Sequence, residues 1–275
     1  MTSHAALIEE IDQTELADGE LAFWWLGQLG FALKLGGEVV YLDAYLSDRP
    51  SRTVRPLVAA EEVTNAAVIT GSHDHSDHID RPVWPVLASA SPGAVFVVPQ
   101  PVLDGGLADD LGMAPERFVG LTGGSSFTRG GLRITGVAAA HERLDVDPAT
   151  GLNPYLGYVV ESNGCRVYHA GDTCKYEGLE THLKGWGPFD VAFLPINGRD
   201  AERLARGCIG NMTYQEAVDL AGEIAPRLVV PAHFEMFADN SQDPGAFVEY
   251  LGVKYPEVAT VVPEHGRRVL LRAGP

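Results

Sequence analysis

Histidine and aspartate side chains gather in one short stretch of the chain, which reads Ser72-His73-Asp74-His75-Ser76-Asp77-His78. Imidazole nitrogens and carboxylate oxygens bind divalent metals at about 2.0–2.2 Å, and two ions roughly 3.5–4 Å apart would fit this set of ligands. In an extended backbone, side chains two apart point the same way, so we expect His73 and His75 to approach one cation together. A turn after them would bring Asp77 and His78 to the opposite side.

Chance is a poor explanation for this stretch. The chain has 9 histidines in 275 residues, so an accidental H-x-H-x-D-H pattern is on the order of one in a thousand. The pattern therefore predicts a metal site rather than a polar loop.

Three later residues complete a candidate ligand set. His141 ends one apolar segment, Asp172 follows another within Tyr168-His169-Ala170-Gly171-Asp172-Thr173, and His233 follows a third. Any one of them alone would be interpreted as a capping residue or as a polar residue whose hydrogen bonds are made within the protein. Because all three lie where a strand is expected to end, a site at the rim of a sheet would collect them.

The elements that must position these residues are short apolar strands with helices between them. Strands are expected at 21–35 (two, around a glycine turn), 39–43, 66–70, 95–98, 132–139, 155–161, 166–170, 191–195, 228–231, 259–262 and 268–271. Helices are expected at 82–90, 102–111, 176–184, 213–224 and 244–251. Such strands need cover on both faces, which predicts an α+β fold of two packed sheets with helices outside. No linker divides the chain, so one domain is expected over residues 1–275.

Composition narrows the range of functions. The chain has 20 Lys and Arg against 37 Asp and Glu, a net charge of −17, and this charge repels phosphate backbones and anionic membranes. We therefore expect neither a nucleic-acid nor a membrane partner. The 3 cysteines have no C-x-x-C spacing, so neither a disulfide framework nor a cysteine-rich zinc site is predicted. Without a signal peptide or a long apolar run, a cytoplasmic protein is expected.

The order H-x-H-x-D-H, His, Gly-Asp-Thr, His resembles that of the metallo-β-lactamase superfamily. The resemblance implies a di-metal centre at the edge of an αβ/βα sandwich, with two mixed sheets and helices on their outer faces. It implies that one ion is held by His73, His75 and His141. It likewise implies that Asp77, His78 and His233 hold the other ion and that Asp172 bridges the two.

One branch of that superfamily is more similar still. The segments that carry this likeness are Trp25-Leu26-Gly27-Gln28-Leu29-Gly30-Phe31, Leu42-Asp43-Ala44-Tyr45-Leu46-Ser47, His78-Ile79-Asp80, Leu194-Pro195-Ile196-Asn197-Gly198, Gly210-Asn211-Met212-Thr213 and Met236-Phe237-Ala238-Asp239-Asn240. They resemble the L-ascorbate-6-phosphate lactonases. This implies Mn²⁺ dependence, a cytoplasmic location and a homo-oligomer. The affinity order of divalent metals favours Zn²⁺ at a His-rich site, so Zn²⁺ is the alternative.

The function expected is hydrolysis of a lactone, either a sugar-acid or a sugar-phosphate lactone, by a metal-activated hydroxide. Asp77 and Asp172 are the expected catalytic carboxylates, orienting the hydroxide or carrying the proton. The expected substrate is small and anionic, and the predicted substrate-binding residues are Asn197, Arg199, Lys175, Asn211 and Asn240. A phosphodiesterase or nuclease of the same fold is the alternative function, a thioesterase is another, and a non-enzymatic scaffold is the third. The net charge and the short interval from Asp172 to His233 weigh against a nuclease.

Overall fold

The computed structural model describes residues 4–272. Its first sheet has 7 strands in the order β15-β1-β2-β3-β4-β5-β6. Their bounds are β1 Leu21–Gly27, β2 Gly30–Leu35, β3 Glu38–Leu42, β4 Val68–Thr70, β5 Val95–Pro99, β6 Phe118–Leu121 and β15 Arg268–Leu271. The segment 21–35 forms an antiparallel hairpin, as predicted, and β3 to β6 run parallel.

The second sheet has 6 strands in the order β14-β13-β12-β11-β8-β7. Their bounds are β7 Ser126–Arg129, β8 Leu132–Ala138, β11 Leu156–Ser162, β12 Cys165–His169, β13 Val191–Pro195 and β14 Leu228–Ala232. A separate pair, β9 Ala140–His141 and β10 Arg143–Leu144, continues from the end of β8.

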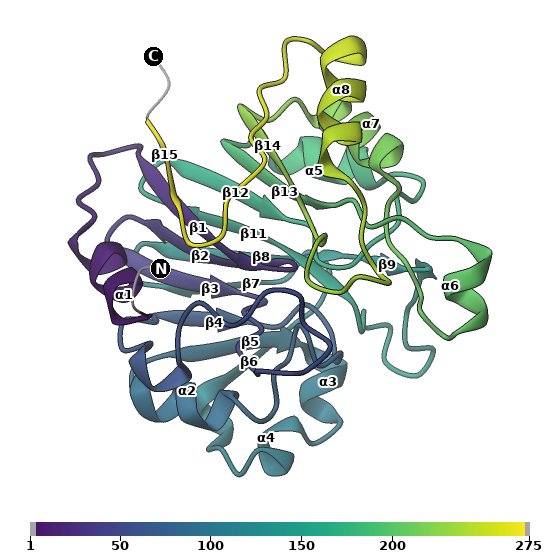
Figure 1. The fold of residues 1–275 in the computed structure, drawn as a ribbon. Helices are drawn as coiled ribbons and strands as arrows, with labels where there is room; N and C mark the ends of the chain where they lie inside the picture. Colours follow the sequence, from purple (N-terminus) through teal and green to yellow (C-terminus); the bar gives the residue numbers. More distant parts are fainter. Residues whose placement is uncertain (1–3, 273–275) are drawn as a thin grey trace.

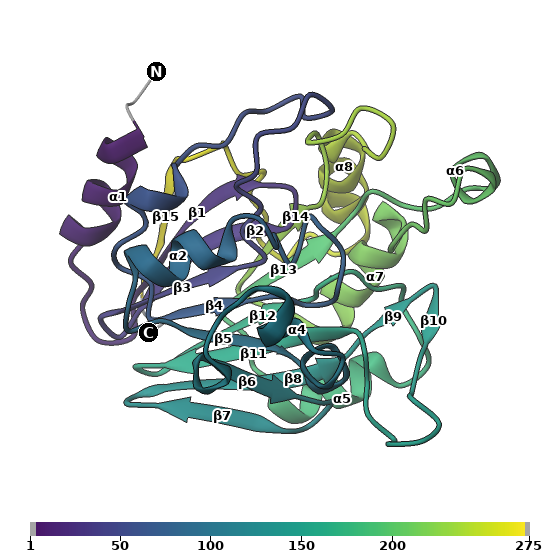
Figure 2. The same cartoon turned by 90° about the horizontal axis from the view of Figure 1, so that it is seen from below.

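Helices lie outside the two sheets, which are stacked against each other (Figures 1 and 2). On the side of the first sheet are α1 His4–Gln13, α2 Trp84–Ala90, α3 Gln100–Asp104 and α4 Leu107–Asp110, with the 3-10 turns η1 Ala60–Glu62 and η2 Pro115–Arg117. On the side of the second sheet are α5 Leu179–Trp186, α7 Tyr214–Ile224 and α8 Pro244–Lys254, and α6 Ala201–Ala205 projects beside them. The predicted α+β sandwich of two packed sheets with outer helices is confirmed.

Aromatic side chains join the two sheets at their inner faces. Phe193 of β13 stacks on Phe31 of β2, with ring centroids 3.9 Å apart, and meets Phe23 of β1 edge-on at 5.0 Å. The neighbouring tryptophans point to opposite faces of β1, because side chains alternate along a strand. Trp25 packs into the core between the sheets, and Trp24 packs into the cluster under α1 and α2.

Two expected elements are corrected. The segment 102–111 is not one helix but two short ones, because Gly105 and Gly106 interrupt it and Gly106 has a φ of +96°. Glycine adopts this left-handed conformation readily and so ends helices. The segment 259–262 is not a strand, since only Thr260 bridges to Val229 of β14.

Strand direction determines where the polar residues emerge. In the second sheet β12, β13 and β14 are parallel, and β8 runs the same way because both β8 and β12 are antiparallel to β11. Their carboxyl ends therefore meet at one edge of the sheet. The carboxyl ends of β3 and β4 of the first sheet meet in the same way. His141, Asp172 and His233 all follow strands at this edge of the second sheet.

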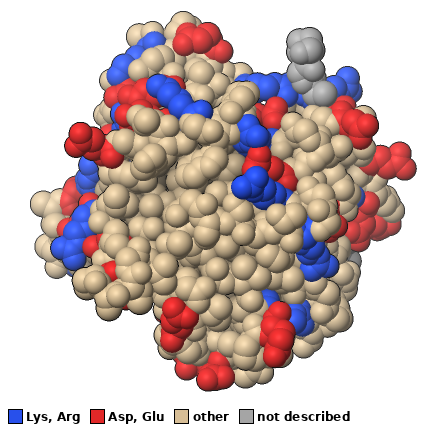
Figure 3. All heavy atoms as spheres, turned by 180° about the vertical axis from the view of Figure 1, so that it is seen from behind, with Lys and Arg blue, Asp and Glu red and all other residues tan. Residues whose placement is uncertain are grey.

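Charged side chains are spread unevenly over the surface. Figure 3 shows the face on the side of β7 and α5, where Lys, Arg, Asp and Glu lie mainly around the margin and the middle is largely free of them. Within residues 4–272, no helix has both the length and the apolar character needed to cross a membrane.

Candidate metal centre

The histidine motif follows β4 and folds as a series of tight turns rather than an extended segment. The backbone N–H of His75 donates to the carbonyl of His73 at 3.0 Å, and that of His78 donates to the carbonyl of His75 at 3.0 Å. The expected alternation of side chains along a strand is therefore wrong. The two imidazoles converge nonetheless, because the turn brings Nε2 of His73 within 2.8 Å of Nδ1 of His75.

The first group of donors contains His73, His75 and His141, whose ring nitrogens lie within 4.8 Å of one another. His73 and His141 are buried, whereas His75 is exposed at the mouth of the group. The backbone of the segment beside β9 fixes His141, since Ala140 accepts a hydrogen bond from the N–H of Cys174 at 2.7 Å. This hydrogen bond joins the loop that carries Asp172 to the segment that carries His141.

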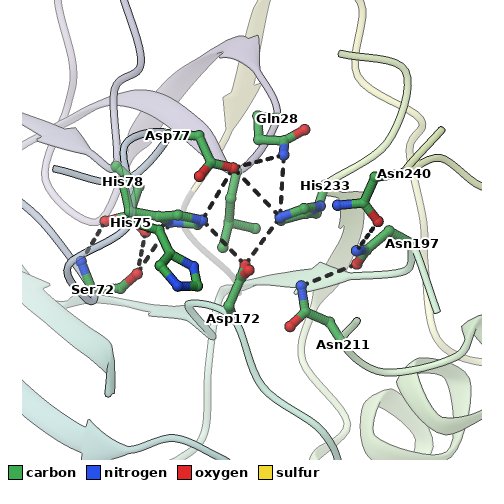
Figure 4. A network of polar contacts seen from close by, with 12 residues as sticks. Gln28, Ser72, His75, Asp77, His78, Asp172, Asn197, Asn211, His233 and Asn240 are labelled. Carbon is green, nitrogen blue, oxygen red and sulfur yellow. Dashed lines mark hydrogen bonds and ion pairs between the residues drawn. The ribbon is translucent and has the colours of Figure 1, made fainter. Parts of the chain in front are cut away.

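The second group contains Asp77, His78 and His233, again with donor atoms within 4.8 Å of one another. Nε2 of His78 lies 3.5 Å from Oδ2 of Asp77, and Nε2 of His233 lies 4.0 Å from the same oxygen. Figure 4 shows these side chains pointing toward one another from different loops.

Asp172 lies between the two groups. Its Oδ2 is 3.6 Å from Nε2 of His141 in the first group. Its Oδ1 is 3.4 Å from Nε2 of His78 and 3.2 Å from Nε2 of His233 in the second. Gly171 makes this placement feasible, because at its φ of +63° a Cβ would lie 2.3 Å from the carbonyl oxygen of Leu156.

Asp43, the residue after β3, holds the motif from behind. Its Oδ2 lies 2.6 Å from Nδ1 of His78 and accepts the hydroxyl of Ser72 at 2.6 Å. Its Oδ1 accepts the backbone N–H of Ser72 at 2.9 Å. The Ser72 hydroxyl also lies 3.0 Å from Nδ1 of His73. A carboxylate behind a metal-binding imidazole fixes the ring orientation and the tautomer.

The surrounding charges set the protonation states of the cluster. Burial lowers the pKa of His73 well below its usual range, and His78 lowers it further. Burial alone would lower the pKa of His78 too, but Asp172 and Asp77 raise it well above its usual range. Burial alone would raise the pKa of Asp172, yet His233 and His78 hold it well below its usual range. The cluster thus keeps His73 neutral and Asp172 ionised, the forms in which both side chains bind cations.

The donor set fits a pair of divalent cations. Nε2 of His78 and Oδ1 of Asp172 are buried and have no hydrogen-bond partner within residues 4–272, although polar atoms buried in a protein are normally paired. Both atoms face the other donors (Figure 4). Five imidazoles and two carboxylates, in two groups with Asp172 between them, are the residue types that divalent transition metals prefer.

The three predicted asparagines form one chain of amides beside His233 (Figure 4). Nδ2 of Asn211 donates to Oδ1 of Asn197 at 3.1 Å, and Nδ2 of Asn197 donates to Oδ1 of Asn240 at 2.9 Å. Arg203, which the sequence analysis did not single out, donates to Oδ1 of Asn240 at 3.0 Å. Oδ1 of Asn211 is buried without a hydrogen-bond partner among the described residues.

The two predicted cations are occupied elsewhere. Arg199 makes a bidentate pair with Glu216 of α7, at 2.6 and 2.7 Å. Lys175 pairs with Glu223 of the same helix at 2.8 Å. Each charge is already matched by a carboxylate, and the role of these two side chains in binding an anionic substrate stays a prediction.

A small pocket includes Glu142, the residue that follows the predicted ligand His141. It has a volume of about 140 Å³ and is lined by Glu142, Arg199, Asp200, Leu204, Cys208, Ile209 and Gly210. Glu142 directly follows His141, and the carbonyl of Gly210 accepts the Cys174 thiol at 3.9 Å. Burial raises the pKa of the Cys174 and Cys208 thiols, so neither is activated as a nucleophile.

Sequence reasoning missed three residues around the cluster. Asp43 and Gln28 lie in segments that carry the likeness to the lactonases, and their place directly after strands was the available signal. Tyr155 lies with its ring centroid 5.5 Å from that of His73 and 5.2 Å from that of His141. Nothing in its local sequence marks it, because it precedes an ordinary buried strand.

Two mixed sheets with a His and Asp cluster at their shared edge define a metallo-β-lactamase-fold protein. Comparison with known proteins agrees: a family model described as the beta-lactamase superfamily domain matches residues 39–234. The chain belongs to this superfamily, and it is a metal-dependent hydrolase.

Relatives and solved structures support this membership. A UPF0173 metal-dependent hydrolase of Thermococcus kodakarensis is 32% identical over 232 residues, covering 84% of this chain and 92% of the relative. A UPF0173 metal-dependent hydrolase of Cupriavidus taiwanensis is 30% identical over 275 residues, covering 92% of this chain and 87% of the relative. The structure of Igni18, a metallo hydrolase from Ignicoccus hospitalis, shares the fold with a TM-score of 0.71 and 20% identity, covering 92% of this chain and 98% of that chain. The superfamily prediction is confirmed, and the lactonase branch stays a prediction.

Proposed function

We propose that this protein opens the ring of a small lactone by metal-dependent hydrolysis. The observation that carries the proposal is Asp172, which lies within 3.6 Å of imidazoles from both donor groups. Divalent cations held there by the seven predicted ligands would polarise a carbonyl and bring the pKa of a water to about 7. A lactone carbonyl is an electrophile suited to such a centre, and its ring alkoxide needs only one proton to leave.

The two carboxylates have different surroundings, and we assign them different tasks. The side chain of Asp172 is 6% exposed and surrounded by imidazoles, so it holds the two groups together. The side chain of Asp77 is 20% exposed, so it can reach a substrate. We assign to Asp77 the transfer of the proton to the leaving alkoxide.

Contacts around the pocket favour a neutral substrate over an anionic one. Arg199 and Lys175 are neutralised by glutamates, and the pocket also contains Glu142. Leu204 and Ile209 supply apolar surface there. The amides of Asn197, Asn211 and Asn240 suit uncharged hydroxyl groups, and Oδ1 of Asn211 needs a donor. We therefore propose a neutral sugar-acid lactone rather than its phosphorylated form.

A substrate screen tests the proposal. The metal-free protein would be loaded separately with Mn²⁺, favoured by the lactonase likeness, and with Zn²⁺, and each form assayed on neutral lactones, phosphorylated lactones and phosphodiesters. We expect hydrolysis of neutral lactones by at least one form. Clear phosphodiesterase activity without hydrolysis of any lactone would overturn the proposal in favour of the nuclease-like alternative. A light-scattering mass on the same samples would test the expected homo-oligomer.

A further inference from the structure

Gln28 occupies the turn between β1 and β2 and is fixed there by its backbone. Its carbonyl oxygen accepts Nε1 of Trp25 at 3.0 Å and the N–H of His233 at 2.8 Å. Its φ of 55° lies in the left-handed region, which costs about 1–3 kcal/mol for a residue other than glycine. A fully buried polar residue in a strained turn is unusual, and the turn aims its side chain into the donor cluster (Figure 4).

The amide of Gln28 meets two atoms of the second donor group. Its Nε2 lies 2.9 Å from Oδ2 of Asp77 and 3.2 Å from Nε2 of His233. Its Oε1 is buried and has no hydrogen-bond partner among residues 4–272. One end of the amide therefore faces the predicted ligands, and the other end has nothing to bind.

This orientation conflicts with a cation in the second group. Nε2 of His233 has one lone pair, and a cation there takes it, so an N–H of Gln28 would point at an atom that cannot accept it. Turning the amide by half a turn keeps its shape and places Oε1 where Nε2 lies. An oxygen at that position faces the cation as a donor of electrons.

We propose that Gln28 is a further ligand of the cation held by Asp77, His78 and His233, through its carbonyl oxygen. This inference rests on the metal centre proposed above. It makes the two sites chemically different. The first group offers three imidazoles, which suit Zn²⁺, whereas the second gains a third oxygen beside those of Asp77 and Asp172, and oxygen ligands suit harder cations such as Mn²⁺.

Two substitutions separate a ligand from a mere hydrogen-bond donor. Gln28→Leu removes both ends of the amide at similar size. Gln28→Glu keeps an oxygen for the cation but removes the N–H that faces Asp77. If Gln28 is a ligand, the Gln28→Glu variant should bind Mn²⁺ at least as tightly as the wild-type protein does. If Gln28 only donates to Asp77, the new carboxylate would repel Asp77, and affinity should fall at least as far as in the leucine variant.

The measurement is titration of the metal-free full-length protein with Mn²⁺ by calorimetry and chelator competition, with metal content as a second readout. We expect Gln28→Leu to lower the affinity for one of the two ions by about ten- to a hundredfold, which is the usual cost of losing a residue that supports a metal site. Gln28→Glu should keep both ions. The matched pair Gln13→Leu and Gln13→Glu, at a glutamine that donates to Glu9 on the surface of α1, should leave both affinities unchanged.

Each contrary result has a separate meaning. Unchanged Mn²⁺ binding in Gln28→Leu, or weak binding in Gln28→Glu, would overturn the assignment of Gln28 while leaving the other ligands in place. If Gln28→Leu does not fold, the nearly isosteric Gln28→Glu still decides the question. If the wild-type protein binds no more metal than His73→Ala or His78→Ala, the metal centre itself fails, and this inference fails with it.

Discussion

Asp43→Asn isolates the contribution of a carboxylate that touches no predicted metal position. Asp43 is fully buried behind His78 and Ser72, and its φ is 41°. Asparagine has the same shape and tolerates the left-handed region, so the backbone of the turn should be preserved. The substitution removes the negative charge opposite Nδ1 of His78 and keeps the shape of the side chain.

The expected magnitude follows from the hydrogen bonds of Asp43. Its Oδ2 lies 2.6 Å from Nδ1 of His78 and 2.6 Å from the Ser72 hydroxyl. An amide nitrogen at that position donates and cannot accept, so at least one of these two hydrogen bonds would be lost. His78 would then be free to rotate or change its tautomer. Loss of such a support costs about ten- to a hundredfold in metal affinity, which is about 1.4–2.8 kcal/mol.

The assay is metal titration of Asp43→Asn beside turnover at limiting and saturating metal. We expect weaker binding of the ion at His78, with most of the turnover restored at saturating metal because every ligand is still present. Asp48→Asn serves as the control, since Asp48 lies further along the same loop and pairs only with the exposed Arg55 among the described residues. Equal metal affinity in the wild-type protein and Asp43→Asn would refute the reasoning.

Three further predictions use single substitutions. His73→Ala should remove metal and activity together, because a donor shared by the cluster is lost, and unchanged metal content by elemental analysis would contradict this. Asp172→Ala should cost far more turnover than Asp110→Ala, whose carboxylate is 61% exposed, and comparable rates for the two would remove the bridging role. Arg199→Ala should change KM equally for neutral and phosphorylated lactones, because Glu216 already neutralises the guanidinium; a selective loss of about tenfold or more on the phosphorylated substrate would return Arg199 to phosphate binding.

The cluster of candidate ligands could be predicted from sequence because two patterns mark its donors. His73, His75 and His78 are close together in the chain, and such spacing of metal-binding residue types rarely arises by chance. His141 and His233 are isolated, but each follows an apolar segment, and parallel strands deliver their ends to one edge. The same reasoning gave the wrong backbone for the motif, since residue types indicate donors without indicating whether the chain is extended or turned.

The ion pairs outside the cluster could not be predicted, because the two partners of each pair lie far apart in the sequence. Arg199 and Lys175 could not be assigned to Glu216 and Glu223, because no local pattern links a loop cation to a particular helix face. Helix α7 itself was predicted well, since Thr213 and Glu216 form a local capping box that the structure contains. Helix boundaries follow local chemistry, whereas ion pairs follow the packing of the whole chain.

Backbone strain follows the same division between local and global causes. Gln28, Asp43, Glu142 and His233 all have positive φ, at 55°, 41°, 78° and 58°. None is glycine, and each costs about 1–3 kcal/mol in isolation. All four lie at or next to a proposed metal ligand or its support. Local preferences would never choose these conformations, so the buried sheets on either side must impose them. The cluster is therefore a consequence of the packed sandwich, which brings seven donors from four separate segments of the chain within reach of one another.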